Sequence, residues 1–379
     1  MRILLFTQQL AAFRSGVGTY VNALINGLRH LGHQITAVVP EGEDIEIPDL
    51  RILTVSHSRF DPTPGGWLSL GTSFAKILSN EAMKYDIAHF TDAREAWYVR
   101  HSPIPITGMI NDSYALDWMD ENFSRNIFAD RYRRGFYYWL LRALERHTYC
   151  RLDSVVVNSK YVGRKVINNY RIDPKKLFLI YIGLPDQLSI DPIPLSGSPA
   201  ILFVGSNFQR KGLPSLLKAT AQLRPQFPDI RVHVVGKDSN QGHLVRQARK
   251  LGIDKSVEFH GPQPNDHVRG MMTGANIFVL PSLTEAFGLV YLEAMRAGTP
   301  IIATSMGGAK EVFVGGKEAL FVDPEDEKGL AMAIAKITSS PNTAYRLSQG
   351  GKAAAKRFTF DAMGRETEKF LLNALEKSL

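Results

Sequence analysis

The sequence contains little cysteine and no long hydrophobic run. Cys150 is the single cysteine in 379 residues, which excludes an intramolecular disulfide framework and suits a reducing compartment. No window holds the roughly 18 consecutive apolar residues that a membrane-spanning helix needs. The apolar start, residues 1–10, is short and lacks the small-residue cleavage site of a signal peptide, so we expect a buried first strand there. These absences predict a cytoplasmic protein.

Several binding motifs are missing as well. The formal net charge of +8 favours nucleic acid, anionic membrane or phosphorylated ligands. No zinc-finger, RNP or helix-turn-helix signature is present, so we do not expect nucleic acid as a partner. The sequence has no D-x-D pair for a metal-held diphosphate and no His/Cys cluster with metal-ligand spacing. We therefore expect neither a bound metal nor a cofactor.

What the sequence does contain is a regular alternation of short apolar runs and helical patterns. Continuous apolar strands with crossover helices indicate parallel sheets covered on both faces, and a chain of this length fits two domains. We predict an α/β protein with two doubly wound parallel sheets. The expected strands are residues 2–7, 34–39, 51–55, 86–89, 104–110, 152–157 and 177–182, then 200–205, 230–236, 256–259, 276–280, 299–303 and 319–322, with helices notably at 18–31, 68–80 and 160–170.

A linker separates the two series of strands. The segment from Leu184 to Pro199 is rich in proline, glycine and serine and shows neither a helical nor a strand period. We therefore predict a first domain over residues 1–184, a linker over 185–199 and a second domain over 200–360. Parallel sheets of this kind bind ligands beyond the carboxyl ends of their strands. The expected site is a cleft between the domains, with the linker as a hinge.

The most informative segment runs from Glu285 to Glu293 and reads E-A-F-G-L-V-Y-L-E. It follows the apolar run 276–282. If that run is a strand and a helix begins at Leu289, then Gly288 lies at the turn between them, where free backbone N–H groups can bind an anion. One carboxylate precedes the helix and the other lies about a turn and a half into it. This arrangement places a phosphate site between two carboxylates that can accept hydrogen bonds from hydroxyl groups. It therefore suits a ligand in which a diphosphate joins a sugar to a nucleoside.

Two cations lie in a similar turn after the first strand of the second domain, in F-V-G-S-N-F-Q-R-K-G at residues 203–212. Arg210 and Lys211 would stand at a helix N-terminus, where positive charge is unfavourable for the helix dipole. A bound diphosphate would offset that cost, and both side chains can donate to phosphate oxygens. The alternative is a solvated basic loop.

Two further glycine turns follow a strand and precede a helix. Gly16 and Gly18, after the first strand, would let the backbone approach a phosphate or a sugar, although glycines at such positions also serve tight turns alone. The other turn is S-M-G-G at residues 305–308. Glu311, just after it, either contacts a ligand or only satisfies the dipole of its own helix.

Together these motifs resemble the retaining glycosyltransferases of family 4, which have two facing Rossmann-like domains, the GT-B fold. The resemblance covers nearly the whole chain, and its most specific element is E-x7-E with F-G inside, at residues 285–293. V-G-x5-K-G at 204–212, the glycine loop at 16–18 and G-G-x-x-E at 307–311 support it. The end of the chain looks like the family's last helix, so residues 361–379 are expected to return to the first domain.

The resemblance implies a role for each matching residue. Glu293 would bind the ribose hydroxyls of the donor, and Glu285 would contact the transferred sugar. Lys211 with Arg210 would neutralise the diphosphate leaving group. The remaining donor contacts would come from backbone and glycine positions, namely Phe287, Gly288 and Leu289 in the second domain and Gly16 and Gly18 in the first.

The chain departs from the family pattern at two positions. Ser206 stands where many members carry arginine, and Arg210 would supply that charge instead. Asn111, followed by Asp112, stands where many members have His-Asp. Because that histidine normally lies near the reacting sugar, the asparagine bears on sugar specificity and catalytic detail. Asn111, Asp112 and His89 are candidates for the sugar or acceptor pocket, and His89 has a second interpretation as a buried structural histidine.

The acceptor side rests on fewer features. Arg94, a fourth candidate for the acceptor pocket, stands with Glu95 and Trp97 after a strand end, where all three either line the pocket or belong only to the surface. Residues 125–147 show a helical pattern dense in arginine and aromatic residues. This helix either lies on an anionic membrane, at its inner face beside a lipid-linked acceptor, or packs its aromatics on the core with the arginines in solvent.

The predicted activity is metal-independent transfer of a sugar from a UDP- or GDP-sugar to an acceptor hydroxyl, forming a glycan, a glycolipid precursor or a small glycoside. Backbone N–H groups with Lys211 and Arg210 would stabilise the leaving phosphate. Glycoside hydrolysis fits less well, because Glu293 is better placed on the ribose. The resemblance implies same-face displacement, in which the leaving phosphate helps to deprotonate the acceptor.

Three other functions stay open. A nucleotide-sugar epimerase could use the same two-domain plan without an acceptor pocket. A catalytically silent sugar-nucleotide-binding protein is compatible with Asn111. A nicotinamide-dependent oxidoreductase is disfavoured because G-V-G-T-Y-V, from Gly16, lacks the third glycine of the dinucleotide-binding fingerprint.

Overall fold

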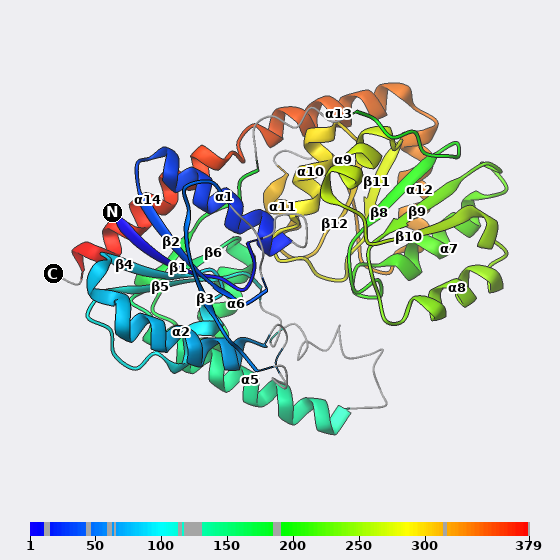
Figure 1. Ribbon diagram of the computed structural model, residues 1–379. Coiled ribbons are helices and arrows are strands. Elements are labelled where there is room, and N and C mark those ends of the chain that lie inside the picture. Colours follow the sequence, from blue (N-terminus) through cyan, green and yellow to red (C-terminus); the bar gives the residue numbers. More distant parts are fainter. Residues whose placement is uncertain are drawn as a thin grey trace. The chain divides into compact units, whose positions relative to one another are not determined.

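The computed structural model of the chain describes residues 1–10, 16–42, 47–58, 63, 66–112, 116, 131–184, 191–313 and 317–377, with side chains from residue 137 in the helix that begins at 131. The chain divides into two compact units (Figure 1). Unit 1 contains Met1–Pro185 and Thr359–Leu379, and unit 2 contains Asp186–Phe358. Each unit is built on its own parallel β-sheet.

The sheet of unit 1 has seven strands in the order β3-β2-β1-β4-β5-β6-β7. Each described pair of neighbours is parallel. The strand order reverses between β1 and β4, and such a reversal favours ligand binding beyond the carboxyl ends of the two strands. The strands are β1 (Arg2–Phe6), β2 (Gln34–Pro40), β3 (Arg51–Val55), β4 (Ile87–Phe90), β5 (Ile106–Ile110), β6 (Ser154–Val157) and β7 (Leu177–Leu179).

Apolar side chains on both faces of this sheet require helices on both faces. Phe6 at the end of β1 stacks on Phe90 of β4, with 4.5 Å between ring centroids, and lies 5.1 Å from the ring of Phe74. The helices of unit 1 are α1 (Gly16–His30), α2 (Trp67–Glu81), α5 (Arg131–Arg151), α6 (Lys160–Tyr170) and α14 (Phe360–Glu376), with the 3-10 helices η2 (Ala82–Lys84), η3 (Ala93–Tyr98) and η5 (Pro174–Lys176).

The sheet of unit 2 has six strands in the order β10-β9-β8-β11-β12-β13. Its described pairs are again parallel. The order reverses between β8 and β11, which makes the carboxyl ends of these strands the expected ligand side of the unit. The strands are β8 (Ala200–Val204), β9 (Arg231–Val235), β10 (Val257–Gly261), β11 (Ile277–Leu280), β12 (Ile301–Thr304) and β13 (Ala319–Val322).

The helices of unit 2 alternate with these strands, as the apolar periodicity predicts. Side-chain caps fix two of their starts, since Asp326 accepts from the N–H of Gly329 and Ser340 accepts from the N–H of Thr343. The helices are α7 (Leu213–Leu223), α8 (Gln241–Lys250), η6 (Asp254–Ser256), α9 (Asn265–Gly274), α10 (Leu289–Ala297), α11 (Ala309–Val312), α12 (Glu327–Thr338) and α13 (Pro341–Ala355).

The last helix, α14, returns to unit 1 and packs along α1 (Figure 1). The backbones of the two helices lie so close together that a Cβ added to Gly27 would be 2.7 Å from the carbonyl oxygen of Phe360. Contacts between His30 and Asp361 at 3.2 Å and between His33 and Glu368 at 2.9 Å continue along the same crossing. The predicted return of the C-terminal helix to the first domain is therefore confirmed.

Each strand predicted from the sequence overlaps an observed one, and the expected helices at 18–31, 68–80 and 160–170 correspond to α1, α2 and α6. The strand predicted from residue 104 begins at Ile106 instead. Pro105 cannot donate to a strand ladder, although its carbonyl still accepts from Ala88 at 3.0 Å. In the predicted linker, residues 191–199 contain neither helix nor strand, and residues 185–190 lie outside the described chain.

The aromatic, arginine-rich segment 125–147 is described from residue 131 onward, as the first part of α5. Tyr138 and Leu141 pack against Trp67 of α2 in a buried cluster. Trp139 and Leu140, on another face of the helix, are exposed to solvent. The described part therefore packs one face on the core, as the core-packing alternative expects. Among the helices of the described chain, we find none both long and apolar enough to cross a membrane.

Candidate functional site

Three loops meet at the carboxyl end of the unit 2 sheet, because β8, β11 and β12 are neighbours in it. The loop after β8 carries Arg210 and Lys211, and the loop after β11 carries Glu285. The N–H of Leu283 donates to the carbonyl of Arg210 at 2.8 Å, and the N–H of Gly308, in the loop after β12, donates to the carbonyl of Glu285 at 2.7 Å. These backbone bonds fix the predicted leaving-group residues and sugar-contacting carboxylate on one surface.

Glycines begin the two helices that start at this surface. Gly212 precedes α7 with φ 81°, and an added Cβ would lie 2.0 Å from the carbonyl oxygen of Pro281. Gly288 precedes α10 with φ 92°, and its Cβ would lie 2.4 Å from the ring of Tyr291. Neither helix has a side-chain cap. At the start of α7, the N–H of Leu213 already donates to the carbonyl of Phe208 at 3.0 Å and Pro214 has no N–H, so α7 offers mainly its positive dipole end. The start of α10 also offers backbone N–H groups to an anion.

Lys211 and Glu285 form a buried ion pair at this position. The Nζ atom of Lys211 lies 2.5 Å from Oε2 of Glu285, and the side chains are 14% and 9% exposed. Ser282 also approaches that oxygen, with its hydroxyl donating at 3.4 Å. Burial raises the pKa of Glu285, but the positive charges of Lys211 and Arg210 outweigh it, so the pKa lies below its usual value. Glu285 is therefore a carboxylate that can accept hydrogen bonds.

Glu293 lies in α10 and turns toward a different neighbour, Arg269 of α9. The closest approach is 4.0 Å, between Oε1 of Glu293 and Nη2 of Arg269, and the glutamate side chain is 14% exposed. Burial raises the pKa of Glu293, and Arg269 offsets this only in part. Within the described part of the chain, no group donates a hydrogen bond to this carboxylate, so its acceptor capacity remains available.

The other residues of unit 2 that were predicted to contact the sugar donor present mainly backbone groups. Phe287 is buried, with its ring 6.0 Å from that of Phe358 in an edge-on contact. Leu289 is the first residue of α10 and is half-buried. Arg210 is half-buried as well, and its own N–H donates to the side chain of Asn207 at 3.3 Å. The guanidinium of Arg210 lowers the pKa of Glu285 and so lies within electrostatic reach of the pair.

In unit 1, Gly16 and Gly18 form the first turn of α1, directly after the undescribed residues 11–15. Gly16 is exposed, and a Cβ added to it would meet nothing within 4 Å. Gly18 is buried, and its carbonyl accepts from Nδ2 of Asn22 at 3.1 Å. The position agrees with the predicted glycine-bearing helix start after the first strand.

The candidate acceptor residues of unit 1 lie after β4 and β5, and Arg94 is at their centre. Its Nη2 atom lies 2.6 Å from Asp92, and its Nη1 atom lies 3.7 Å from Asp112 and 3.9 Å from Glu145. Burial lowers the pKa of Arg94, but the adjacent carboxylates of Asp92 and Asp112 raise it by more. The pKa therefore lies above its usual value and the guanidinium stays charged. The structure thus brings Arg94 and Asp112 together.

Asn111 lies beside this network, and its Nδ2 atom donates to the carbonyl of Thr91 at 2.7 Å. His89 lies apart from it, within β4. Its Nδ1 atom is 2.9 Å from the hydroxyl of Thr107, and its ring packs edge-on against Phe370 of α14 at 6.1 Å. Burial lowers the pKa of His89 to about 4. This placement matches the buried structural alternative, so we leave His89 out of the site proposed below.

The sequence interpretation missed two partners of Arg94. Asp92 stands two residues before it at the same strand end, which was a detectable signal. Glu145 lies in α5, far away in the chain, and gave no such signal. Two residues considered for the acceptor pocket belong to the packing instead, since Glu95 is fully buried and Nε1 of Trp97 donates to the carbonyl of Leu68 at 2.8 Å.

Comparison with known proteins assigns both units to one family. Residues 190–354 match the family described as glycosyl transferases group 1, and residues 14–188 match glycosyltransferase family 4. A glycogen synthase of Mycobacterium tuberculosis is 25% identical over 383 residues, covering 91% of this chain and 87% of the relative. A D-inositol 3-phosphate glycosyltransferase of Corynebacterium urealyticum is 34% identical over 181 residues, covering 46% of this chain and 42% of that protein.

Solved structures with this fold extend over the whole chain. Sucrose-phosphate synthase from Thermosynechococcus elongatus has a TM-score of 0.83 at 21% identity and covers 100% of both chains. The Anabaena protein HepE, solved in complex with UDP-glucose, has a TM-score of 0.73 at 16% identity over 98% of this chain and 100% of that one. The two adjoining family matches, the shared fold and the E-x7-E surface agree, and the chain belongs to the group 1, family 4 glycosyltransferases with the GT-B fold.

Proposed function

We propose that this enzyme transfers a hexose from a nucleoside diphosphate sugar to an acceptor hydroxyl, with retention of the anomeric configuration. The observation that carries the proposal is the buried pair of Lys211 and Glu285 between the N-termini of α7 and α10. A UDP-sugar is the first donor to test, ahead of a GDP-sugar, because HepE shares the fold and has been solved with UDP and with UDP-glucose. The glycogen synthase relative supports a hexose.

The donor diphosphate is proposed to lie against the two uncapped helix starts at Gly212 and Gly288. Lys211 and Arg210 add positive charge at the same place. Preorganised donors of this kind stabilise the negative charge that develops on a leaving phosphate. Glu293 is proposed to accept hydrogen bonds from the ribose hydroxyls, a role supported by its unused acceptor capacity.

Lys211 and Glu285 are proposed to exchange partners when the donor binds. The ammonium group moves from the carboxylate to a phosphate oxygen, and the carboxylate then accepts hydrogen bonds from the hydroxyls of the transferred sugar. The ion pair of the free enzyme supports this exchange, because it holds the two groups next to each other while the donor is absent. The exchange replaces one buried ion pair by two new contacts.

The proposed chemical step is the same-face displacement that the family resemblance implies. The bond between the anomeric carbon and the diphosphate oxygen breaks, and the acceptor oxygen forms its bond to the same face of that carbon. The acceptor proton passes to the leaving phosphate oxygen. Within unit 1, Asn111 and Asp112 are proposed to contact the acceptor, since the side chain of Asp112 is 42% exposed.

A donor panel tests this function directly. UDP-, GDP- and ADP-sugars are compared by thermal shift, since a ligand that binds only the folded state raises its melting temperature. We expect one UDP-hexose to give the largest shift and, with an acceptor glycoside, a product with the donor's anomeric configuration by NMR. Inversion would refute the retaining mechanism. Formation of an epimer from donor alone would instead identify an epimerase, and binding of nicotinamide dinucleotides alone would refute the whole assignment.

A further inference from the structure

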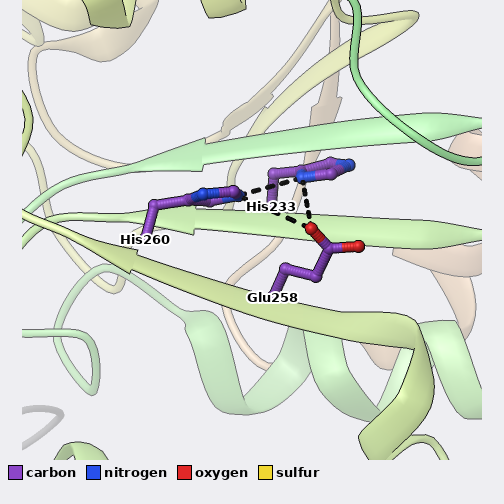
Figure 2. A group of neighbouring side chains, drawn as sticks. All are labelled: His233, Glu258 and His260. Atoms are coloured by element: carbon purple, nitrogen blue, oxygen red, sulfur yellow. Dashed lines mark hydrogen bonds and ion pairs between the residues drawn. The ribbon is translucent and has the colours of Figure 1, made fainter.

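Three potential metal ligands converge on the β9–β10 side of the unit 2 sheet (Figure 2). His233 comes from β9, and Glu258 and His260 come from β10. The register places Glu258 directly opposite His233. His260 lies where the register shifts between Phe259 and Gly261, and its ring turns toward the other two side chains (Figure 2). The cluster lies two strands away from β11, the strand that leads to Glu285.

We propose that His233, Glu258 and His260 bind one zinc ion, with water as a fourth ligand. Nδ1 of His233 and Nε2 of His260 are 3.0 Å apart, and Oε2 of Glu258 lies 3.6 Å from the first and 4.0 Å from the second. Zinc bonds of about 2.0–2.2 Å in a tetrahedron separate neighbouring ligand atoms by about 3.3–3.6 Å. The three atoms therefore need only small shifts to form one face of such a tetrahedron.

His233 and Glu258 also make hydrogen bonds to Ser196 that would hold them in position to bind an ion. Nε2 of His233 donates to the carbonyl of Ser196 at 2.9 Å. A carbonyl can only accept, so this bond puts the proton on Nε2 and leaves the lone pair of Nδ1 facing the cluster. The hydroxyl of Ser196 donates to the other oxygen of Glu258 at 3.0 Å. Zinc-binding histidines and carboxylates typically have such outer partners, which fix their orientation.

The exposure of the cluster also fits a metal site. His233 is buried, whereas the side chains of His260 and Glu258 are 29% and 42% exposed. One side of the cluster is therefore open to solvent, which provides a path for the ion and a place for water.

Without an ion, Nε2 of His260 must carry a proton to make its 3.0 Å contact with His233. Zinc would take the place of that proton, and the ring of His260 would then hold its proton on Nδ1. The proton only moves from Nε2 to Nδ1 of His260, so the ring does not have to release a proton when zinc binds. The bound ion would join the edge strand β10, its neighbour β9 and the segment before β8, which carries Ser196. It would therefore stabilise unit 2 without taking part in sugar transfer.

Metal binding is tested on the full chain after removal of metal with a chelator. Titration with Zn²⁺ is expected to give one bound ion per chain and a higher melting temperature. His260→Ala and Glu258→Gln each change a partly exposed ligand, so the fold should survive, and each is expected to weaken Zn²⁺ binding at least about tenfold. Co²⁺ in the same site should give the visible absorption of a four-coordinate ion.

His267→Ala is the matched control, because His267 is an exposed histidine that lies close enough to lower the pKa of His260 but is not one of the three converging ligands. This variant should bind Zn²⁺ as the parent does. The proposal is overturned if less than one ion binds per chain, or if both ligand variants keep the parent affinity. Loss of binding in His267→Ala alone would also overturn it, since the ion would then lie elsewhere.

Discussion

At the scale of single residues, the ion pair of Lys211 and Glu285 joins two loops that are proposed to act on one donor. Its burial has two consequences. Removing the lysine would remove the proposed leaving-group cation, and it would also leave a buried carboxylate without a partner, which typically costs about 3–5 kcal/mol of folding stability. Activity and stability must therefore be measured together.

We predict that Lys211→Ala lowers kcat by roughly 10²- to 10³-fold, the usual loss for one preorganised charge-stabilising group. Lys218→Ala is the control, because Lys218 forms an exposed ion pair with Glu327 in the same unit. The double variant Lys211→Ala/Glu285→Gln should recover stability in urea but not activity. Full activity in soluble Lys211→Ala would contradict the leaving-group role.

Glu293→Ala is expected to act on nucleotide binding instead. Loss of hydrogen bonds from the ribose hydroxyls to a charged acceptor corresponds to about 1.5–3 kcal/mol. The Kd for UDP, measured by calorimetry, should therefore rise roughly 10- to 150-fold. Glu327→Ala is the control, because Glu327 is a half-buried glutamate of the same unit that pairs with Lys218, and this variant should bind UDP normally. An unchanged Kd in Glu293→Ala would rule out the ribose contact.

Glu145 gives a pH-dependent prediction. Burial raises its pKa from 4.5 to about 7, although Arg94 and Tyr170 act against this. The folded state holds the proton more tightly than the unfolded state, so its stabilising contribution is complete below about pH 4.5 and is lost as the pH rises through 7. The shift corresponds to a contribution on the order of 3 kcal/mol.

Glu145→Gln should remove this dependence, since the amide does not titrate and can still accept from Tyr170. We expect the difference in unfolding free energy between parent and variant to change between pH 5 and pH 8, as measured in urea. The comparison cancels the opposite effect of His89, whose lowered pKa favours the folded state as the pH rises from 4 to 6.5. Parallel pH profiles would contradict the assignment.

At the scale of elements, the crossing of α1 and α14 depends on two glycines in contact. A Cβ on Gly364 would lie 2.7 Å from both the carbonyl carbon and the carbonyl oxygen of Gly27. Backbone atoms cannot move aside as a flexible side chain can, so the helices would have to separate. The absence of side chains at Gly27 and Gly364 therefore lets α14, at the end of the chain, pack directly against α1.

Gly364→Ala should therefore destabilise unit 1 by about 1–3 kcal/mol, the usual cost of overpacking. Gly242→Ala is the matched control, because Gly242 is also helical and its added Cβ would meet only the end of Arg246 at 3.7 Å. We expect no loss of stability there, since alanine favours a helix more than glycine does. Equal melting temperatures for the two variants would contradict the packing argument.

At the scale of the whole molecule, unit 1 is completed by the end of the chain. The chain leaves unit 1 after Pro185 and re-enters it at Thr359. Leu184 and Thr359 form a parallel bridge. Thr359 then caps α14 by accepting from the N–H of Ala362 at 3.1 Å. Phe370 and Leu371 of this helix are buried.

A chain that ends at Phe358 should lose the structure of unit 1 while unit 2 stays folded. Without α14, the ring of Phe178 loses its contact with Phe370 at 5.2 Å, and the face of β4 at His89 is uncovered. Limited proteolysis with mass spectrometry should show early cleavage within residues 1–184 and protection of 200–358. Equal protection of both regions would show that unit 1 does not need its last helix.

The sequence by itself determined the two parallel sheets, the glycine turns and the E-x7-E motif. These features depend on local periodicity and on residue types at short spacing, which can be read along the chain. It also placed Lys211 and Glu285 in turns after strands. It did not show that they form an ion pair, since that depends on β8 and β11 being neighbours in the sheet.

Only the tertiary structure decided which distant side chains share an environment. It placed His89 against Phe370, Arg94 among the carboxylates of Asp92, Asp112 and Glu145, and His233 opposite Glu258. Strand order sets these contacts, and strand order follows from the packing of the whole unit rather than from any local pattern. The pKa and the hydrogen-bond partners of a histidine or glutamate depend on its neighbours and on its exposure to water, and both are set by that packing.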